Sequence, residues 1–159
     1  MQRVTPVKIA ALLWTAIAAA LVGWVTATGF YGSFPPIHLS ASAALWLAAV
    51  LCAVGGVVVR RRIEERRIGF DRSQLQPSTV AQLALCGQAG AWVAALIGGL
   101  YAGVGVHVLF NAGRLMAAQQ DVPGVLAGFA GGIAAAVAGV WLERGCIAPP
   151  ADSALLDAE

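Results

Sequence analysis

The sequence predicts an all-α membrane protein with four transmembrane helices arranged as two hairpins, and two observations predict it. Four apolar stretches contain no Asp, Glu, Lys or Arg: Ile9–Thr28, Ile37–Val59, Val80–Phe110 and Val122–Trp141. About 20 apolar residues cross a hydrocarbon core about 30 Å thick, so each stretch is long enough. The chain is also 59% hydrophobic and only 11% charged, whereas soluble domains carry about 25% charged residues.

The first apolar stretch predicts a membrane span over residues 9–28, preceded by the basic residues Arg3 and Lys8. Its length favours a span that is retained, because the apolar core of a signal peptide is about 7–15 residues long. The alternative is cleavage near the small residues at Val25–Ala27, which would leave three spans and an extracellular N-terminus.

The second and third spans are preceded by prolines. Pro35–Pro36 breaks the chain before the second span, 37–59, since a proline at a helix start loses no hydrogen bond. Pro77 stands before the third helix. The third apolar stretch is longer than a perpendicular span requires, so we expect its first residues in the interface and the span itself at 84–110.

The fourth span is expected at 122–141. Asp121 can cap this helix, with Pro123 in its first turn. The four spans then form one transmembrane domain over residues 1–147, and the polar residues 148–159 predict a flexible cytoplasmic tail.

The placement of the basic residues predicts the orientation in the membrane. Of the ten Lys and Arg residues, all except Arg114 fall on one side in this topology, which leaves nine: Arg3, Lys8, Arg60, Arg61, Arg62, Arg66, Arg67, Arg72 and Arg144. Basic residues accumulate in cytoplasmic loops. We therefore expect an N-in, C-in, multi-pass protein of the bacterial plasma membrane.

The arginine-rich segment after the second span is a candidate contact surface for anionic lipids or a protein partner. Its candidate residues are Arg60, Arg61, Arg62, Arg66 and Arg67. Each arginine beside an anionic membrane is worth about 1 kcal/mol, although the segment can also act only as a determinant of topology. No nucleic-acid partner is expected, because acidic residues interrupt the segment and no set of stacking aromatic residues accompanies it.

Small residues recur every four positions in the third and fourth spans, and residues four apart share a helix face. The candidate packing residues are Ala95, Gly99 and Gly103 in the third span and Gly124, Gly128 and Gly132 in the fourth. Such ridges let membrane helices approach closely. The short connection makes the two helices antiparallel neighbours. A second fourth-span ridge runs along Ala127, Gly131, Ala135 and Gly139. We expect these ridges to pack within the chain; the alternative is that one packs the third helix while the other makes a homodimer or receives a partner's helix.

Few side chains could support catalysis. His38, Tyr101 and His107 are the only plausible acid–base set, and two histidines are too few for a closed zinc site, which takes four ligands. The cysteines match no metal-binding spacing. We therefore expect no cofactor, no metal and no enzymatic activity.

Four short motifs follow one another in a consistent order, which are Tyr31-Gly32-Ser33-Phe34-Pro35-Pro36, Arg60-Arg61-Arg62-Ile63, Gly98-Gly99-Leu100-Tyr101-Ala102-Gly103 and Trp141-Leu142-Glu143-Arg144. In these motifs and their order the chain resembles a family of small actinobacterial membrane proteins known as domain of unknown function 3180. The resemblance implies no activity and no catalytic residues. Genes of that family tend to lie beside folate-biosynthesis genes, which is an association without a mechanism.

Three hypotheses follow. The favoured one is a structural or accessory membrane protein that acts through lipid contacts, self-association or a membrane-protein partner. The alternative is a subunit of an oligomeric transporter or channel for a small molecule, with backbone exposed at Gly98–Gly99 lining a polar path. A membrane enzyme is the third, and the absence of charge in the four stretches argues against proton-coupled chemistry.

Overall fold

The computed structural model describes residues 8–33, 37–64 and 77–146. Four long helices and two short 3₁₀ turns make up this part of the chain: α1 (Ile9–Phe30), η1 (Tyr31–Ser33), η2 (Leu39–Ser42), α2 (Ala43–Glu64), α3 (Pro77–Asn111) and α4 (Met116–Gly145). All four long helices are long and apolar enough to cross a membrane, and the described residues contain no strand. The predicted four-helix membrane fold is confirmed.

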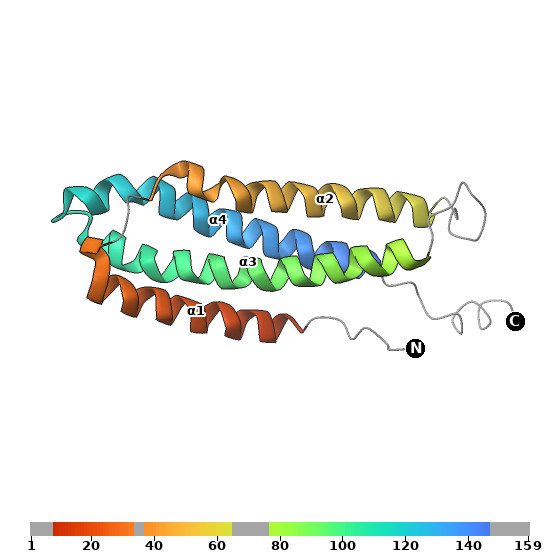
Figure 1. Cartoon of the computed structure of the whole chain (residues 1–159), viewed down its shortest axis with the longest axis horizontal. Coiled ribbons are helices and arrows are strands. Elements are labelled where there is room, and N and C mark those ends of the chain that lie inside the picture. The colour runs from red at the N-terminus through yellow and green to blue at the C-terminus, as the bar shows by residue number, and fades with distance from the viewer. Residues whose placement is uncertain (1–7, 34–36, 65–76, 147–159) are drawn as a thin grey trace, which may run out of the picture.

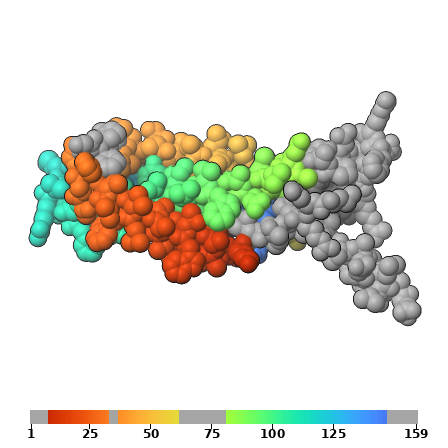
Figure 2. All heavy atoms as spheres, turned by 60° about the horizontal axis from the view of Figure 1, so that its bottom comes forward, coloured from red at the N-terminus to blue at the C-terminus, as the bar shows by residue number. Residues whose placement is uncertain are grey.

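The helices lie side by side in the order α1, α3, α4, α2, which differs from their order in the chain (Figure 1). Within the described residues α1 packs on α3, α4 packs between α3 and α2, and α1 makes no packing contact with α2. Figure 2 shows α3 lying between α1 and α2 on one face of the molecule. Of the two expected hairpins, only the α3–α4 pair is therefore packed along its length, while α1 and α2 are separated by the other two helices.

The start of α1, the end of α2, the start of α3 and the end of α4 lie at one end of the molecule. The residues Ile9, Glu64, Pro77 and Gly145 are at this end, and the opposite turns at Phe30 and Asn111 are at the other (Figure 1). The predicted tail, 148–159, lies outside the described residues.

Glycines bring α3 and α4 into backbone contact. A Cβ atom placed on Gly98 would lie 3.1 Å from the Cα of Gly132, and one placed on Gly87 would lie 2.9 Å from the carbonyl oxygen of Gly139. In lipid no hydrophobic effect drives helices together, so dispersion across such close contacts stabilises the pair. The two contacts also show that α3 and α4 run antiparallel, as expected from the sequence.

The small-residue ridge of α3 faces α1, although we expected it to face the fourth helix. A Cβ atom on Gly99 would lie 3.0 Å from the Cα of Ala16, and one on Gly103 would lie 2.7 Å from the amide nitrogen of Trp24. Ala95 is buried on this side of α3 as well. The physical reason is that successive helical residues are about 100° apart. The Gly98 side of α3 meets α4, and the adjacent Gly99 side meets α1.

The first ridge of α4 contacts the chain before η2 and two residues of α3. A Cβ atom on Gly124 would collide with the carbonyl oxygen of Ile37, and one on Gly128 would lie 2.5 Å from the ring of Tyr101. Gly132 meets Gly98 of α3. The ridge therefore allows both the chain before η2 and α3 to approach α4 closely.

The second ridge of α4 is covered within the chain. Trp46 of α2 donates a hydrogen bond of 3.2 Å from Nε1 to the carbonyl oxygen of Ala127, and its indole also lies against Gly131. Ala135 is buried with Ala49 of α2. Gly139, the last residue of this ridge, instead meets Gly87 and Ala91 of α3. The second ridge is therefore packed within the chain by α2 and α3, and a contact with a partner stays a prediction.

Candidate functional site

A polar cluster joins four segments at the end of the molecule where α3 finishes and α4 begins. Tyr31 follows α1, Ile37 leads into η2, His107 and Asn111 occupy the last turns of α3, and Asp121 lies in the second turn of α4. Because helices packed side by side bring their ends together, residues far apart in the sequence meet here.

Asp121 is the centre of this cluster. Its side chain is only 7% exposed. Tyr31 donates a hydrogen bond of 2.8 Å from its hydroxyl to Oδ2, and the backbone N–H of Ile37 donates one of 2.9 Å to Oδ1. A buried carboxylate is costly without such partners. The two bonds therefore both satisfy Asp121 and attach the connection between α1 and α2 to α4.

The structure assigns Asp121 a different role from the predicted one. The fourth helix begins at Met116, with Leu115 in the N-cap position, so Asp121 lies inside the helix and does not cap it. Hydropathy locates the apolar part of a helix, but backbone hydrogen bonding continues through polar residues such as Gln119 and Gln120. Asp121 instead accepts the N–H of a segment outside its own helix.

His107 lies against the same cluster. Its ring lies against that of Tyr31 in a tilted arrangement, with 5.1 Å between the ring centroids and 46° between the ring planes. The side-chain amide of Asn111 donates a hydrogen bond of 2.9 Å to the backbone carbonyl of His107 and lies 3.5 Å from Nε2 of the ring. The aromatic contact and the amide hold the imidazole at the end of α3.

The three residues considered as an acid–base set do not form one unit. His107 is in the cluster, whereas Tyr101 packs with its ring over Gly128. His38 is exposed and stands at the N-cap position of η2. Among the described residues the structure records no hydrogen bond between the two histidines. The residues that accompany His107 are instead Tyr31 and Asp121, which the sequence did not single out for chemistry.

The electrostatics of the cluster favour a structural role. Burial, followed by the hydrogen bond and the negative charge of Asp121, raises the pKa of Tyr31 to about 12. The phenol is therefore a protonated donor at neutral pH, and each carboxylate oxygen of Asp121 already accepts one hydrogen bond. Within the described part of the chain no group of three or more His, Cys, Asp or Glu residues could hold a metal ion.

A second carboxylate is buried at the opposite end of α4. Glu143 is 1% exposed and is the largest fully buried side chain in the described structure. The fourth span was expected to end at residue 141, before Glu143, but α4 continues to Gly145. Glu143 therefore lies inside the helix layer, and its backbone nitrogen lies close to Gly87 of α3.

The predicted arginine surface is described only in part. Arg60 and Arg61 are exposed at the end of α2, and Arg62 belongs to the same helix. Arg66 and Arg67 lie outside the described residues. The expected contact with lipid or a partner stays a prediction.

Sequence reasoning missed the α3 face that meets α4, although a signal for it was present. Gly87, Ala91, Ala94 and Gly98 are separated by four, three and four residues, the alternation that keeps side chains on one face of a helix packed against a neighbour. Strict four-residue spacing instead selects the neighbouring face of α3, which contains Gly99 and Gly103 and meets α1. For Asp121 no comparable signal existed, because its partners come from another part of the chain.

Comparisons with known proteins place the chain in one family. No curated protein and no solved structure matches the chain. The model of one protein family, described as "Protein of unknown function (DUF3180)", matches residues 12–150. That match covers all four long helices except the first residues of α1, and the chain therefore belongs to the DUF3180 family.

Proposed function

We propose that this protein is a structural or accessory component of the bacterial plasma membrane, which acts by contacting lipid and a neighbouring membrane protein and not by catalysis. The observation that carries the proposal is the open helix layer. Among the long helices α1 packs only on α3, so most of its surface faces outward. That surface is apolar, and Trp14, for example, is 72% exposed.

The distribution of cations supports an N-in, C-in orientation. Lys8, Arg60, Arg61 and Arg144 lie near the end of the molecule that holds the start of α1 and the end of α4, whereas Arg114 lies at the other end. The cation-rich end would face the cytoplasm. The exposed arginines of α2 would then lie beside the anionic lipids of the inner leaflet.

The packing gives less support to transport. A polar path lined by backbone at Gly98 and Gly99 was the basis of that alternative. Gly98 lies against Gly132, and Gly99 lies against Ala16, so neighbouring helices cover both glycines. The polar cluster gives no support to catalysis either, since the hydrogen bonds of Asp121 are made within the protein.

Site-specific photo-crosslinking in native membranes tests the accessory role. A photoreactive residue in place of Trp14 faces away from α3, whereas the same residue in place of Ala19, which is 5% exposed, faces the protein interior. We expect a discrete crosslink to one protein neighbour or a second copy from position 14 and crosslinks only within the chain from position 19.

One combination of results would contradict the accessory role. If position 14 and the exposed Leu51 of α2 both yield only lipid adducts, and the extracted protein is strictly monomeric, the accessory role is refuted.

A further inference from the structure

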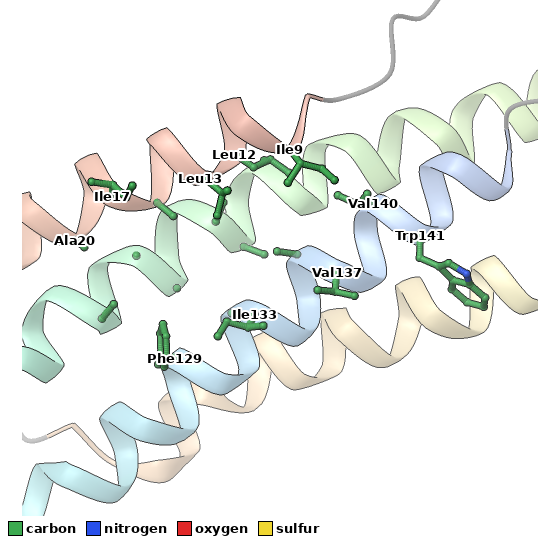
Figure 3. Close-up of a pocket in the computed structure, with 18 of the residues that line it drawn as sticks. Ile9, Leu12, Leu13, Ile17, Ala20, Phe129, Ile133, Val137, Val140 and Trp141 are labelled. Carbon is green, nitrogen blue, oxygen red and sulfur yellow. The ribbon is translucent and has the colours of Figure 1, made fainter.

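An apolar groove runs along α3 between α1 and α4 (Figure 3). Its floor consists of small residues of α3, including Ala94, Gly98 and Ala102, and its walls include Leu13 of α1 and Val137 of α4. The groove has a volume of about 610 Å³, within the range of about 300–1,000 Å³ that is typical of ligand sites. Leu13 and Val137 are each more than half exposed, so the groove opens on the surface.

The chain leaves this groove open for a simple reason. The floor residues of α3 have no side chain or only a methyl group, so nothing rises from the floor to fill the space. Among the described helices α1 touches α3 but makes no packing contact along α4. Atoms that line a void lose their dispersion contacts on that side, so in a membrane an apolar occupant is favoured.

The two ends of the groove differ in charge. Arg144, which is exposed, lines one end. Ile9 of α1 lines the same end, and the exposed Lys8 precedes it directly. The residues lining the other end include Ala20 and Phe129 (Figure 3) and carry no charge.

The neighbouring acidic side chain does not cancel these cations within the groove. Glu143 precedes Arg144 in the sequence, but it is 1% exposed and does not line the groove. The groove therefore has one cationic end and one uncharged end.

Along its α1 wall the groove is about as long as one leaflet of a bilayer is thick. From Ile9 to Ala20 the α1 wall rises about 16 Å, at about 1.5 Å per residue. One half of a hydrocarbon core about 30 Å thick measures about 15 Å. An acyl chain that entered at the cationic end would reach the membrane midplane near the uncharged end.

We propose that this groove binds one anionic phospholipid, with an acyl chain between α1 and α4 and its phosphate at Arg144 and Lys8. Guanidinium groups bind phosphate through paired N–H donors, and an ammonium group adds a compact positive charge. A neutral helix from a second copy would also fill the apolar part, but it would leave both cations unmatched. The proposal goes beyond the accessory role and depends only on the membrane setting.

Native mass spectrometry of the full chain tests this site. The protein is equilibrated with phosphatidylglycerol and phosphatidylcholine of identical acyl chains, and the lipid retained on each chain is counted. We expect one retained phosphatidylglycerol per chain in preference to phosphatidylcholine. Arg144→Gln and Lys8→Gln should each lower that preference about fivefold, whereas Arg61→Gln, at the same end but on α2, should change it less than twofold.

A steric pair tests the position of the acyl chain. Val137→Trp places a large side chain in the groove, while Val54→Trp makes the same enlargement at a comparably exposed position of α2. We expect only Val137→Trp to lower the retention of phosphatidylglycerol. Circular dichroism and size-exclusion chromatography of both variants establish that they are folded.

Three results would overturn the proposal. They are equal retention of the two lipids by the wild-type protein, an equal effect of Arg61→Gln and Arg144→Gln, and a lipid-free dimer that Val137→Trp converts to a monomer. The photo-crosslinking experiment is independent of these results. Selective lipid retention with no protein neighbour would support the groove and refute the accessory role.

Discussion

Replacing Asp121 with alanine should detach the connection between α1 and α2 from α4. The carboxylate accepts hydrogen bonds from the Tyr31 hydroxyl and the Ile37 amide at 2.8 and 2.9 Å. A hydrogen bond to a charged group contributes about 1.5–3 kcal/mol, and a buried donor left without an acceptor adds its desolvation cost. Both donors are only partly buried, so we take the lower end for each and expect Asp121→Ala to reduce the free energy of unfolding by about 3 kcal/mol.

A double-mutant cycle isolates the phenol–carboxylate bond. Tyr31→Phe removes one donor and should cost about 1.5 kcal/mol. In a chain that already carries Asp121→Ala, the Tyr31 hydroxyl has no carboxylate to bond, so Tyr31→Phe should have little further effect. The loss in free energy of unfolding of the double variant should therefore be about 1.5 kcal/mol smaller than the sum of the losses of the two single variants. The assay is reversible unfolding in mixed micelles with increasing sodium dodecyl sulfate, followed by circular dichroism.

A control at the same end of the molecule tests whether the effect is specific. The hydroxyl of Thr28 is exposed and bonds only to the Val25 carbonyl of its own helix, so Thr28→Ala should change the free energy of unfolding by less than about 0.5 kcal/mol. Strict additivity of Asp121→Ala and Tyr31→Phe would refute the reasoning, because it would mean that the two side chains stabilise the fold independently.

Three further outcomes are expected. Folding raises the pKa of Tyr31 from its ordinary value of 10.0 to about 12. The stabilisation linked to the phenol proton is therefore present below pH 10 and is lost as the pH rises through 12. Tyr31→Phe should remove this loss of stability from unfolding curves measured at alkaline pH. Gly103→Val should destabilise the protein by at least about 2 kcal/mol in the micelle assay, because a Cβ there collides with α1, whereas Gly29→Ala, which meets nothing within 4 Å, should be neutral or stabilising. Trp46→Phe should cost about 1 kcal/mol, measured the same way, through loss of its bond to the α4 backbone.

The apolar stretches were sufficient to predict the number of helices and their approximate positions. The first predicted span, 9–28, corresponds closely to α1 at Ile9–Phe30. The fourth, 122–141, corresponds to a helix that runs from Met116 to Gly145. Hydropathy reports where a helix prefers lipid, whereas the helix ends where its backbone hydrogen bonds end, so polar turns at both ends were missed.

The burial of the two carboxylates could not be predicted because it depends on tertiary partners. Asp121 is buried since Tyr31 and the Ile37 amide reach it from a segment more than 80 residues earlier in the chain. Glu143 is buried because α3 packs against the last turns of α4 near Gly87. In the sequence both residues border an apolar stretch, and sequence alone does not distinguish a solvated carboxylate from a buried one at such a position.

The small residues of α3 explain why the protein forms an open layer. Gly98 and Gly99 are adjacent but face two different helices, so α3 accepts a close neighbour on each side, and the two neighbours are held apart by the width of α3. Because these glycines carry no side chain, nothing projects from α3 into the space between its two neighbours, and both glycines line the groove. A bulkier α3 would still be apolar and would still span a membrane. It would lose both close contacts and fill the groove floor at once, so the packing of α1 and the proposed lipid site depend on the same glycines.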